Sequence, residues 1–113
     1  TVARKIKVKP DLVNERGADR GLTPLMVATV RGDPLMVKLL LDNDAKVWLP
    51  DKADWTALHY AVLKNHLPVV QLLLSAGADP RNLTRGENGY HSALNLAHSD
   101  ECKKLLEGAI AGR

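Results

Sequence analysis

The chain has 113 residues, of which 45% are hydrophobic and 26% charged, so its composition is that of one folded domain with a modest core. Phe is absent and aromatic residues make up 4%, which leaves Leu, Val and Ala to build that core. No apolar run approaches the roughly 18 residues of a membrane span, and no signal peptide opens the chain. The single cysteine excludes an internal disulfide and favours a reducing intracellular compartment, most simply the cytoplasm.

Positive charge gathers at one end of the chain. Arg4, Lys5, Lys7 and Lys9 all precede the first acidic residue, Asp11. Without these four charges the formal net charge of +3 becomes −1. The basic character therefore belongs to the start of the chain and not to the rest of it.

The first predicted element is the end of a helix over residues 2–8, followed by an exit loop over residues 9–14. Because the chain begins inside this element, we expect the sequence to be a fragment of a longer protein.

Residues 18–50 then predict a helix, a tight turn and a second helix. Thr23 and Pro24 are typical of an N-cap and a first helical residue, since the Thr oxygen accepts a free N–H and Pro needs none there. Residues 31–34 (Arg-Gly-Asp-Pro) end this helix and cap the next, which covers residues 35–41.

The same plan returns after 33 residues. Residues 21–28 recur as residues 54–61, and residues 37–41 recur as residues 70–74. Self-similarity at a short fixed period indicates stacked units that bury their apolar faces against one another.

In the second unit, residues 51–83, Thr56 is the expected cap of the first helix and residues 65–66 form the turn. Residues 69–74 form the second helix, which Gly77 ends because glycine adopts the left-handed conformation without strain.

A third unit, residues 84–113, is altered. Its first helix, residues 92–97, comes 36 residues after its counterpart, because the loop around residues 85–89 is longer. The turn at residues 98–100 is shorter, and a helix over residues 101–106 ends the pattern. A polar, atypical last unit would close the apolar end of a stack.

These units resemble the ankyrin repeat, whose pattern runs Gly-x-Thr-Pro-Leu-His-x-Ala, then Val-Val-x-Leu-Leu-Leu, then Gly-Ala-Asp. Residues 21–28 match it except that Met26 stands in place of His. Residues 56–61 match with Ala in place of Pro, and residues 69–79 match almost throughout. The resemblance covers about residues 10–107.

The resemblance implies an all-α fold, a solenoid of stacked antiparallel helix pairs with projecting loop hairpins. We expect a partial N-terminal unit over residues 1–17, repeats over residues 18–50 and 51–83, and an altered C-terminal capping repeat over residues 84–113. Members of this family mostly bind other proteins through loop tips and the concave face of the first helices, and catalysis is not their usual activity. Fold alone does not determine function, so the function must be inferred from the residues on the surface.

In ankyrin repeats, the residue before each capping Thr or Ser and the late residues of each first helix usually face the concave groove. Such positions here combine apolar and basic side chains, which is typical of an interaction site. The predicted partner-binding residues are Arg20, Leu22, Val30, Arg31, Trp48, Lys52, Trp55, Leu63, Lys64, Tyr90 and His91. Their charge favours an acidic or carboxylate-bearing protein partner.

Two aromatic positions allow a second interpretation. Trp55 could instead cover the neighbouring loop, and Trp48 could either pack against Pro50 or anchor a partner at a loop tip. The resemblance also implies that the imidazole of His59 bridges loop backbone between repeats, which is a structural role.

Nothing in the pattern indicates an enzyme, a metal site or a cofactor. A nucleophile and base pair of Cys102 and His98 would need one continuous helix, yet a turn is expected between them. His66, His91 and His98 lack the spacing of zinc ligands. We therefore expect no catalytic residues, no metal and no cofactor.

Two alternatives to protein binding remain. The basic residues at positions 4, 5, 7 and 9 are typical of contact with nucleic acid or anionic lipid, although no aromatic residue lies among them to stack on bases. A structural spacer is the third possibility. In that case the continuous apolar strip that the sequence predicts would be an interface within a larger protein; its residues are Leu22, Val30, Trp55, Leu63 and Tyr90.

Overall fold

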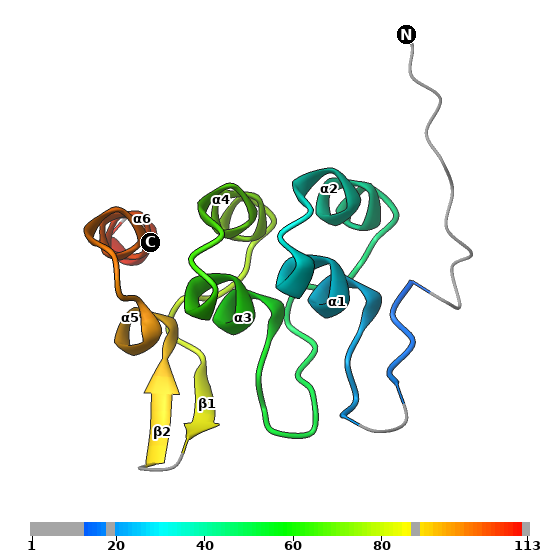
Figure 1. Cartoon of the computed structure of the whole chain (residues 1–113), viewed down its shortest axis with the longest axis horizontal. Coiled ribbons are helices and arrows are strands. Elements are labelled where there is room, and N and C mark those ends of the chain that lie inside the picture. The colour runs from blue at the N-terminus through cyan, green and yellow to red at the C-terminus, as the bar shows by residue number, and fades with distance from the viewer. Residues whose placement is uncertain (1–12, 18–19, 87–88, 112–113) are drawn as a thin grey trace, which may run out of the picture.

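The computed structural model describes residues 13–17, 20–86 and 89–111, which form a two-layered stack of short helices (Figure 1). The predicted helix over residues 2–8 and the basic cluster lie outside these residues. The elements, in chain order, are α1 (Pro24–Arg31), α2 (Pro34–Asp42), α3 (Ala57–Leu63), α4 (Leu67–Ser75), β1 (Leu83–Gly86), β2 (Gly89–Ser92), α5 (Ala93–Leu96) and α6 (Asp100–Ala111).

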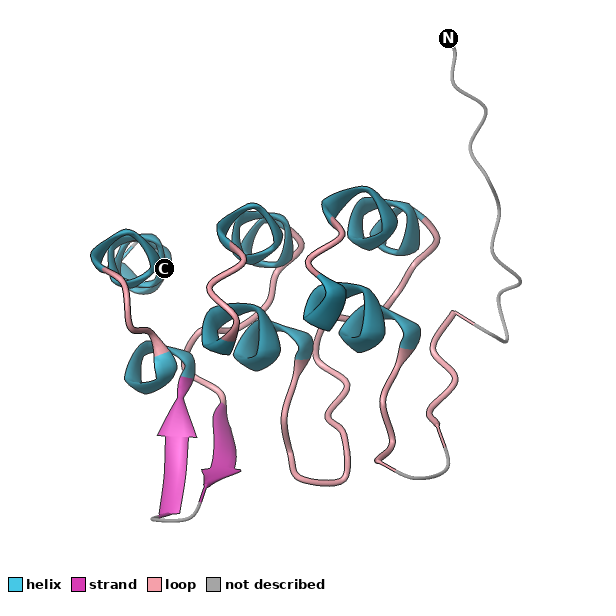
Figure 2. Cartoon of the chain, viewed as in Figure 1, coloured by secondary structure: helices cyan, strands magenta, loops and turns pink. Residues whose placement is uncertain are grey.

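Helices α1, α3 and α5 form one layer, and α2, α4 and α6 form the other (Figure 1). Each helix of the first layer contacts its partner in the second layer and its neighbour in the next unit. The loops that join the units project to one side of the stack (Figure 2). The predicted stack of antiparallel helix pairs with projecting hairpins is confirmed. None of the described helices is long and apolar enough to cross a membrane.

The predicted caps set the helix ends. The Thr23 hydroxyl accepts a hydrogen bond from the Met26 N–H at 3.2 Å, and the Asp33 carboxylate accepts one from the Met36 N–H at 3.1 Å. Each satisfies a donor that the first turn of a helix leaves without a partner. Gly32 ends α1 in the left-handed conformation, with φ of 68°. The two helices of the first unit are therefore separated by a minimal turn.

The third unit differs from expectation in three ways. The lengthened loop forms two antiparallel strands, with Leu83 opposite Ser92 and Gly86 opposite Gly89. The expected all-α fold therefore also contains a two-stranded sheet. Helix α5 ends at Leu96 because Ala97 is extended. Helix α6 runs from Asp100 to Ala111 instead of over residues 101–106.

A single apolar core runs through the stack, and its largest fully buried side chains include those of Leu25, Leu58, Leu73 and Leu106. The start of the described chain is tied to the first unit by Asn14. Its side-chain oxygen accepts from the Lys46 N–H at 2.8 Å, and its amide nitrogen donates to the Asp44 carbonyl at 3.3 Å. Residues 13–17 thus belong to the folded stack.

Gly32, in the turn between α1 and α2, has little room for a side chain. A Cβ at this position would lie 2.6 Å from the Cε1 atom of His66, and the positive φ would strain any larger residue. We expect Gly32→Ala to lower the free energy of unfolding by about 1–2 kcal/mol in urea denaturation. Gly77→Ala is the matched control, because its φ is also positive, 96°, but nothing lies within 4 Å. Equal losses in both variants would mean that His66 imposes no constraint.

Candidate functional site

A hollow of about 520 Å³ lies between the projecting loops of the first two units and helix α3. The Lys52 N–H donates to the Arg20 carbonyl at 2.9 Å, which holds these two loops side by side. Four predicted binding residues meet here, as two basic side chains and two apolar ones. The lining residues are Arg20, Asp51, Lys52, Ala53, Trp55, Tyr60 and Leu63.

Asp51 forms the base of this hollow. One carboxylate oxygen accepts from the backbone N–H groups of Ala53 at 2.8 Å and Trp55 at 2.9 Å, and the other accepts from the Tyr60 hydroxyl. The residue is only 4% exposed. Both carboxylate oxygens are therefore used to fix the loop and the aromatic side chain beside it.

Sequence reasoning missed Asp51 and Tyr60. A signal was present for Asp51, because an aspartate in a loop often accepts hydrogen bonds from backbone N–H groups two or more residues further on. Tyr60 carried no such signal, since its hydroxyl meets Asp51 only after α3 folds against the loop.

Trp55 both packs and remains accessible. Its ring centroid lies 5.1 Å from that of Tyr60 and 6.0 Å from that of His59. The residue is half-buried and still lines the hollow. The two interpretations of Trp55, as a loop cover and as a binding residue, are thus compatible in one conformation.

Burial raises the pKa of Tyr60 above its ordinary value of 10.0, and the hydrogen bond and negative charge of Asp51 raise it further. The positive charge of Arg20 acts in the opposite direction. Tyr60 is therefore a neutral hydrogen-bond donor to Asp51 throughout the physiological pH range.

Other predicted binding residues lie along α1 and α3 near Leu63, which itself lines the hollow. Val30 and Leu63 occupy equivalent places near the ends of α1 and α3, are 36% and 42% exposed, and are each followed by an exposed basic residue, Arg31 or Lys64. Leu22 is half-buried at the end of the preceding loop. The basic and apolar side chains therefore alternate along the first layer of helices.

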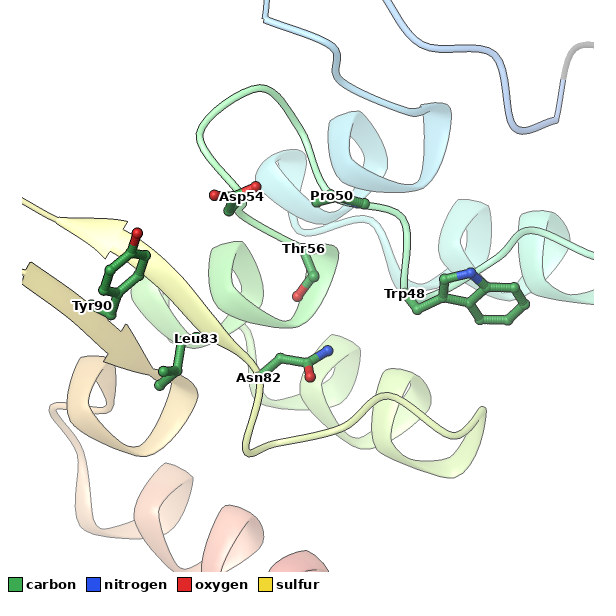
Figure 3. Close-up of a pocket in the computed structure, with 7 residues that line it drawn as sticks. All are labelled: Trp48, Pro50, Asp54, Thr56, Asn82, Leu83 and Tyr90. Atoms are coloured by element: carbon green, nitrogen blue, oxygen red, sulfur yellow. The ribbon is translucent and has the colours of Figure 1, made fainter.

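A second hollow, of about 370 Å³, has the other two predicted aromatic residues, Trp48 and Tyr90, in its lining (Figure 3). It is lined by Trp48, Pro50, Asp54, Thr56, Asn82, Leu83 and Tyr90. Successive residues of an extended segment point to opposite sides. Thr56 lines this hollow whereas its neighbour Trp55 lines the first, so the two hollows open on different sides of this loop.

Two residues of the predicted strip, Trp55 and Tyr90, therefore line different hollows. Tyr90 lines the second hollow with Trp48, away from Trp55. Within β2, Tyr90 and His91 alternate in direction, so the pair cannot both face one groove. His91 is half-buried and lines neither hollow.

The role that the resemblance implied for His59 is confirmed. Its Nδ1 atom accepts from the Thr56 N–H at 3.0 Å, and its Nε2 atom lies 2.9 Å from the Asn82 carbonyl. The imidazole therefore bridges the loops of consecutive units, with the proton on Nε2. Burial lowers the pKa of His59 below 6.5, although the Asn82 carbonyl and the charge of Asp51 act in the opposite direction.

This lowered pKa makes stability depend on pH. Below pH 6.5 the unfolded chain binds a proton at His59 more readily than the folded chain does, so the free energy of unfolding falls as the pH falls through this window. His59→Asn should weaken the dependence of the free energy of unfolding on pH. An asparagine fits this position, because in the third unit the side-chain oxygen of Asn95 accepts the equivalent hydrogen bond from the Ser92 N–H at 3.0 Å. Urea denaturation of both proteins between pH 5 and 8 measures the difference, and parallel curves would contradict the role of His59.

Cys102 and His98 do not form a nucleophile and base pair. Cys102 is fully buried, and burial raises the pKa of its thiol. His98 lies before α6 and places its Nε2 atom 3.0 Å from the Leu63 carbonyl. Among the described residues, no group of three or more His, Cys, Asp or Glu side chains could hold a metal ion.

Comparison with known proteins gives concordant matches. A family model described as ankyrin repeats, in three copies, matches residues 2–84. Ankyrin repeat domain-containing protein 63 of Mus musculus is 46% identical over 67 residues, which cover 56% of this chain and 17% of that protein. The probable E3 ubiquitin-protein ligase XBOS34 of Oryza sativa subsp. japonica is 42% identical over 96 residues, which cover 82% of this chain and 18% of that protein.

The chain thus spans less than a fifth of the length of these two relatives. Among solved structures, the ankyrin repeat domain of Bcl-3, a member of the IkappaB protein family, superposes with a TM-score of 0.77 and 28% sequence identity. The match covers 85% of this chain and 41% of that one.

Proposed function

This chain belongs to the ankyrin-repeat family, and we propose that it is a non-catalytic module that binds a segment of a partner protein on its concave face. Ankyrin repeats are generally protein-interaction modules, and the hollow at Trp55 is the observation that carries the proposal for this chain. We place the module inside the cell, most simply in the cytoplasm. We also propose the division into units that the sequence predicts, over residues 1–17, 18–50, 51–83 and 84–113.

Charge indicates the kind of partner. Arg20 and Lys52 line the hollow, while its carboxylate, Asp51, is buried and hydrogen-bonded through both oxygens. A partner segment with an acidic side chain beside an apolar one matches this arrangement. The apolar side chain would lie against Trp55 and Leu63, and the acidic one near the two basic residues. Buried aromatic contacts of this kind carry a large share of binding energy at protein interfaces.

A comparison of two baits tests the proposal. The chain and its Trp55→Ala, Leu63→Ala double variant are each exposed to a cell lysate and washed at low and high salt. We expect one protein to survive high salt on the first bait and to be lost from the second, whose fold is checked by circular dichroism. Leu35→Ala is the matched control, because Leu35 is 81% exposed on α2, in the other layer. If the double variant retains the same proteins, the concave site is wrong.

Salt separates the alternatives. Material that both baits retain and that high salt removes would favour nucleic acid or anionic lipid bound to Arg4, Lys5, Lys7 and Lys9, which lie outside the described residues. If neither bait retains any material at low or high salt, the result would favour a structural spacer, in which the Trp55 hollow is covered within a larger protein.

A further inference from the structure

The loop over residues 51–56, which we call the central loop, is held by hydrogen bonds to the loops on both sides of it (Figure 1). On one side, the Lys52 N–H donates to the Arg20 carbonyl at 2.9 Å. On the other side, the Thr84 hydroxyl on β1 donates to the Ala53 carbonyl at 3.3 Å. Arg20 and Ala53 are equivalent positions, 33 residues apart. The first bond uses a backbone N–H that most residue types supply, whereas the second needs a side-chain hydroxyl.

The side chain of Thr84 points inwards from the hairpin of the third unit. Thr84 is 0% exposed, whereas its neighbour Leu83 is 56% exposed, which fits the alternation of side chains along a strand. A hydroxyl removed from water in this way needs a hydrogen bond, because a buried polar group without a partner is costly. The Ala53 carbonyl supplies the acceptor. The buried hydroxyl therefore fixes the hairpin against the central loop.

We infer that Thr84 is a positioning residue of the concave hollow, an inference that rests on the proposed function. Ala53 and Trp55 line that hollow, and none of its described lining residues belongs to the third unit. Thr84 therefore acts on a site that it does not touch, by holding the backbone of Ala53. The third unit thus takes part in binding through the shape of the central loop and not through contact with the partner.

Both polar backbone groups of Ala53 are used. Its N–H donates to the Asp51 carboxylate at 2.8 Å, and its carbonyl accepts from Thr84. The next residue, Asp54, has a φ of 65°, a left-handed conformation that residues other than glycine keep where neighbouring groups hold it. The chain then continues directly to Trp55, whose side chain lines the hollow. Removing the Thr84 bond frees one side of this turn, and the direction of Trp55 is then less well fixed.

Two substitutions separate the hydroxyl of Thr84 from the space that its side chain fills. Thr84→Val keeps the shape of the side chain and removes the hydroxyl, which takes this donor away from the Ala53 carbonyl. Thr84→Ser keeps the hydroxyl and removes the methyl group. If Thr84 positions the loop through its hydrogen bond, the serine variant behaves as the unchanged chain and the valine variant does not. The reverse order would mean that Thr84 only fills space, and would overturn the inference.

Hydrogen exchange followed by nuclear magnetic resonance tests the positioning without a partner. We expect Thr84→Val to speed the exchange of the Ala53 and Trp55 backbone amides at least about fivefold, since both donate to Asp51 from the central loop. The Leu73 amide in α4 should exchange at the same rate as in the unchanged chain, and Thr84→Ser should leave all these rates unchanged. Unchanged rates in Thr84→Val, or equal acceleration at Leu73, would contradict the role of Thr84.

Binding of the protein retained from the lysate at high salt tests the consequence for the hollow. The Thr84→Val bait should retain at most about a fifth of what the unchanged chain retains, and Thr84→Ser should retain as much as the unchanged chain. Equal retention by the valine variant would overturn the inference, even with faster exchange. If the unchanged chain itself retains no protein at high salt, the proposed function fails, and the exchange rates alone then decide whether Thr84 positions the loop.

Discussion

Leu73→Ala should lower the free energy of unfolding by about 3 kcal/mol, the largest loss that we expect from one apolar truncation. Leu73 lies on α4 and is 0% exposed, within the core that α4 shares with the neighbouring units. Removing its side chain leaves a cavity as well as losing buried apolar surface, and rigid helix pairs on both sides limit collapse. Urea denaturation followed by circular dichroism measures the change.

The adjacent Leu72 provides the control for this prediction. It is only partly buried and borders a shallow surface hollow with Pro68, Gln71 and Ser75. Leu72→Ala removes the same atoms from the same helix, so differences in helix propensity cancel. We expect its loss to be less than half that of Leu73→Ala. Similar losses would mean that α4 is packed differently from the account given above.

Asp51→Ala should lower the free energy of unfolding by about 2–3 kcal/mol and disorder the binding hollow at the same time. The substitution removes the acceptor of the Ala53 and Trp55 N–H groups and of the Tyr60 hydroxyl. Donors left without a partner in a buried place cost more than the lost bonds themselves. Denaturation gives the stability change, and Trp fluorescence reports whether the indole of Trp55 remains packed.

Asp51→Asn is the matched variant, since its side-chain oxygen can still accept from the Ala53 and Trp55 N–H groups. Only the acceptor for the Tyr60 hydroxyl changes in character, because the amide nitrogen donates instead. We expect a loss of less than half that of Asp51→Ala. An equal loss would show that the negative charge of Asp51, and not its hydrogen bonding, stabilises the loop.

The helix ends of the first unit were predictable because local chemistry determines them. Thr23, Asp33 and Gly32 each act within their own turn, so a residue type at a fixed place is enough to identify a cap or a helix end. The 33-residue period then implies the stack, since neither helix of a unit can bury its apolar face alone.

The candidate site was predictable only in part, because it depends on the direction of side chains in the loops. The sequence grouped Trp55 with Tyr90, but the two side chains line different hollows. The strands β1 and β2 arise from the inserted residues, and only pairing across the hairpin fixes which side Tyr90 faces. Asp51 and Tyr60 are nine residues apart in the sequence, and no sequence motif indicates that their side chains form a hydrogen bond.

A photoreactive cross-linker in place of Leu63 tests most directly whether a partner lies on the concave face. Leu63 is 42% exposed at the Trp55 hollow, and a benzophenone side chain there reaches anything bound in it. The same group in place of Leu35, on the other helix layer, is the control. We expect the partner retained at high salt to be cross-linked from position 63 and not from position 35. Cross-linking from position 35 alone would contradict it.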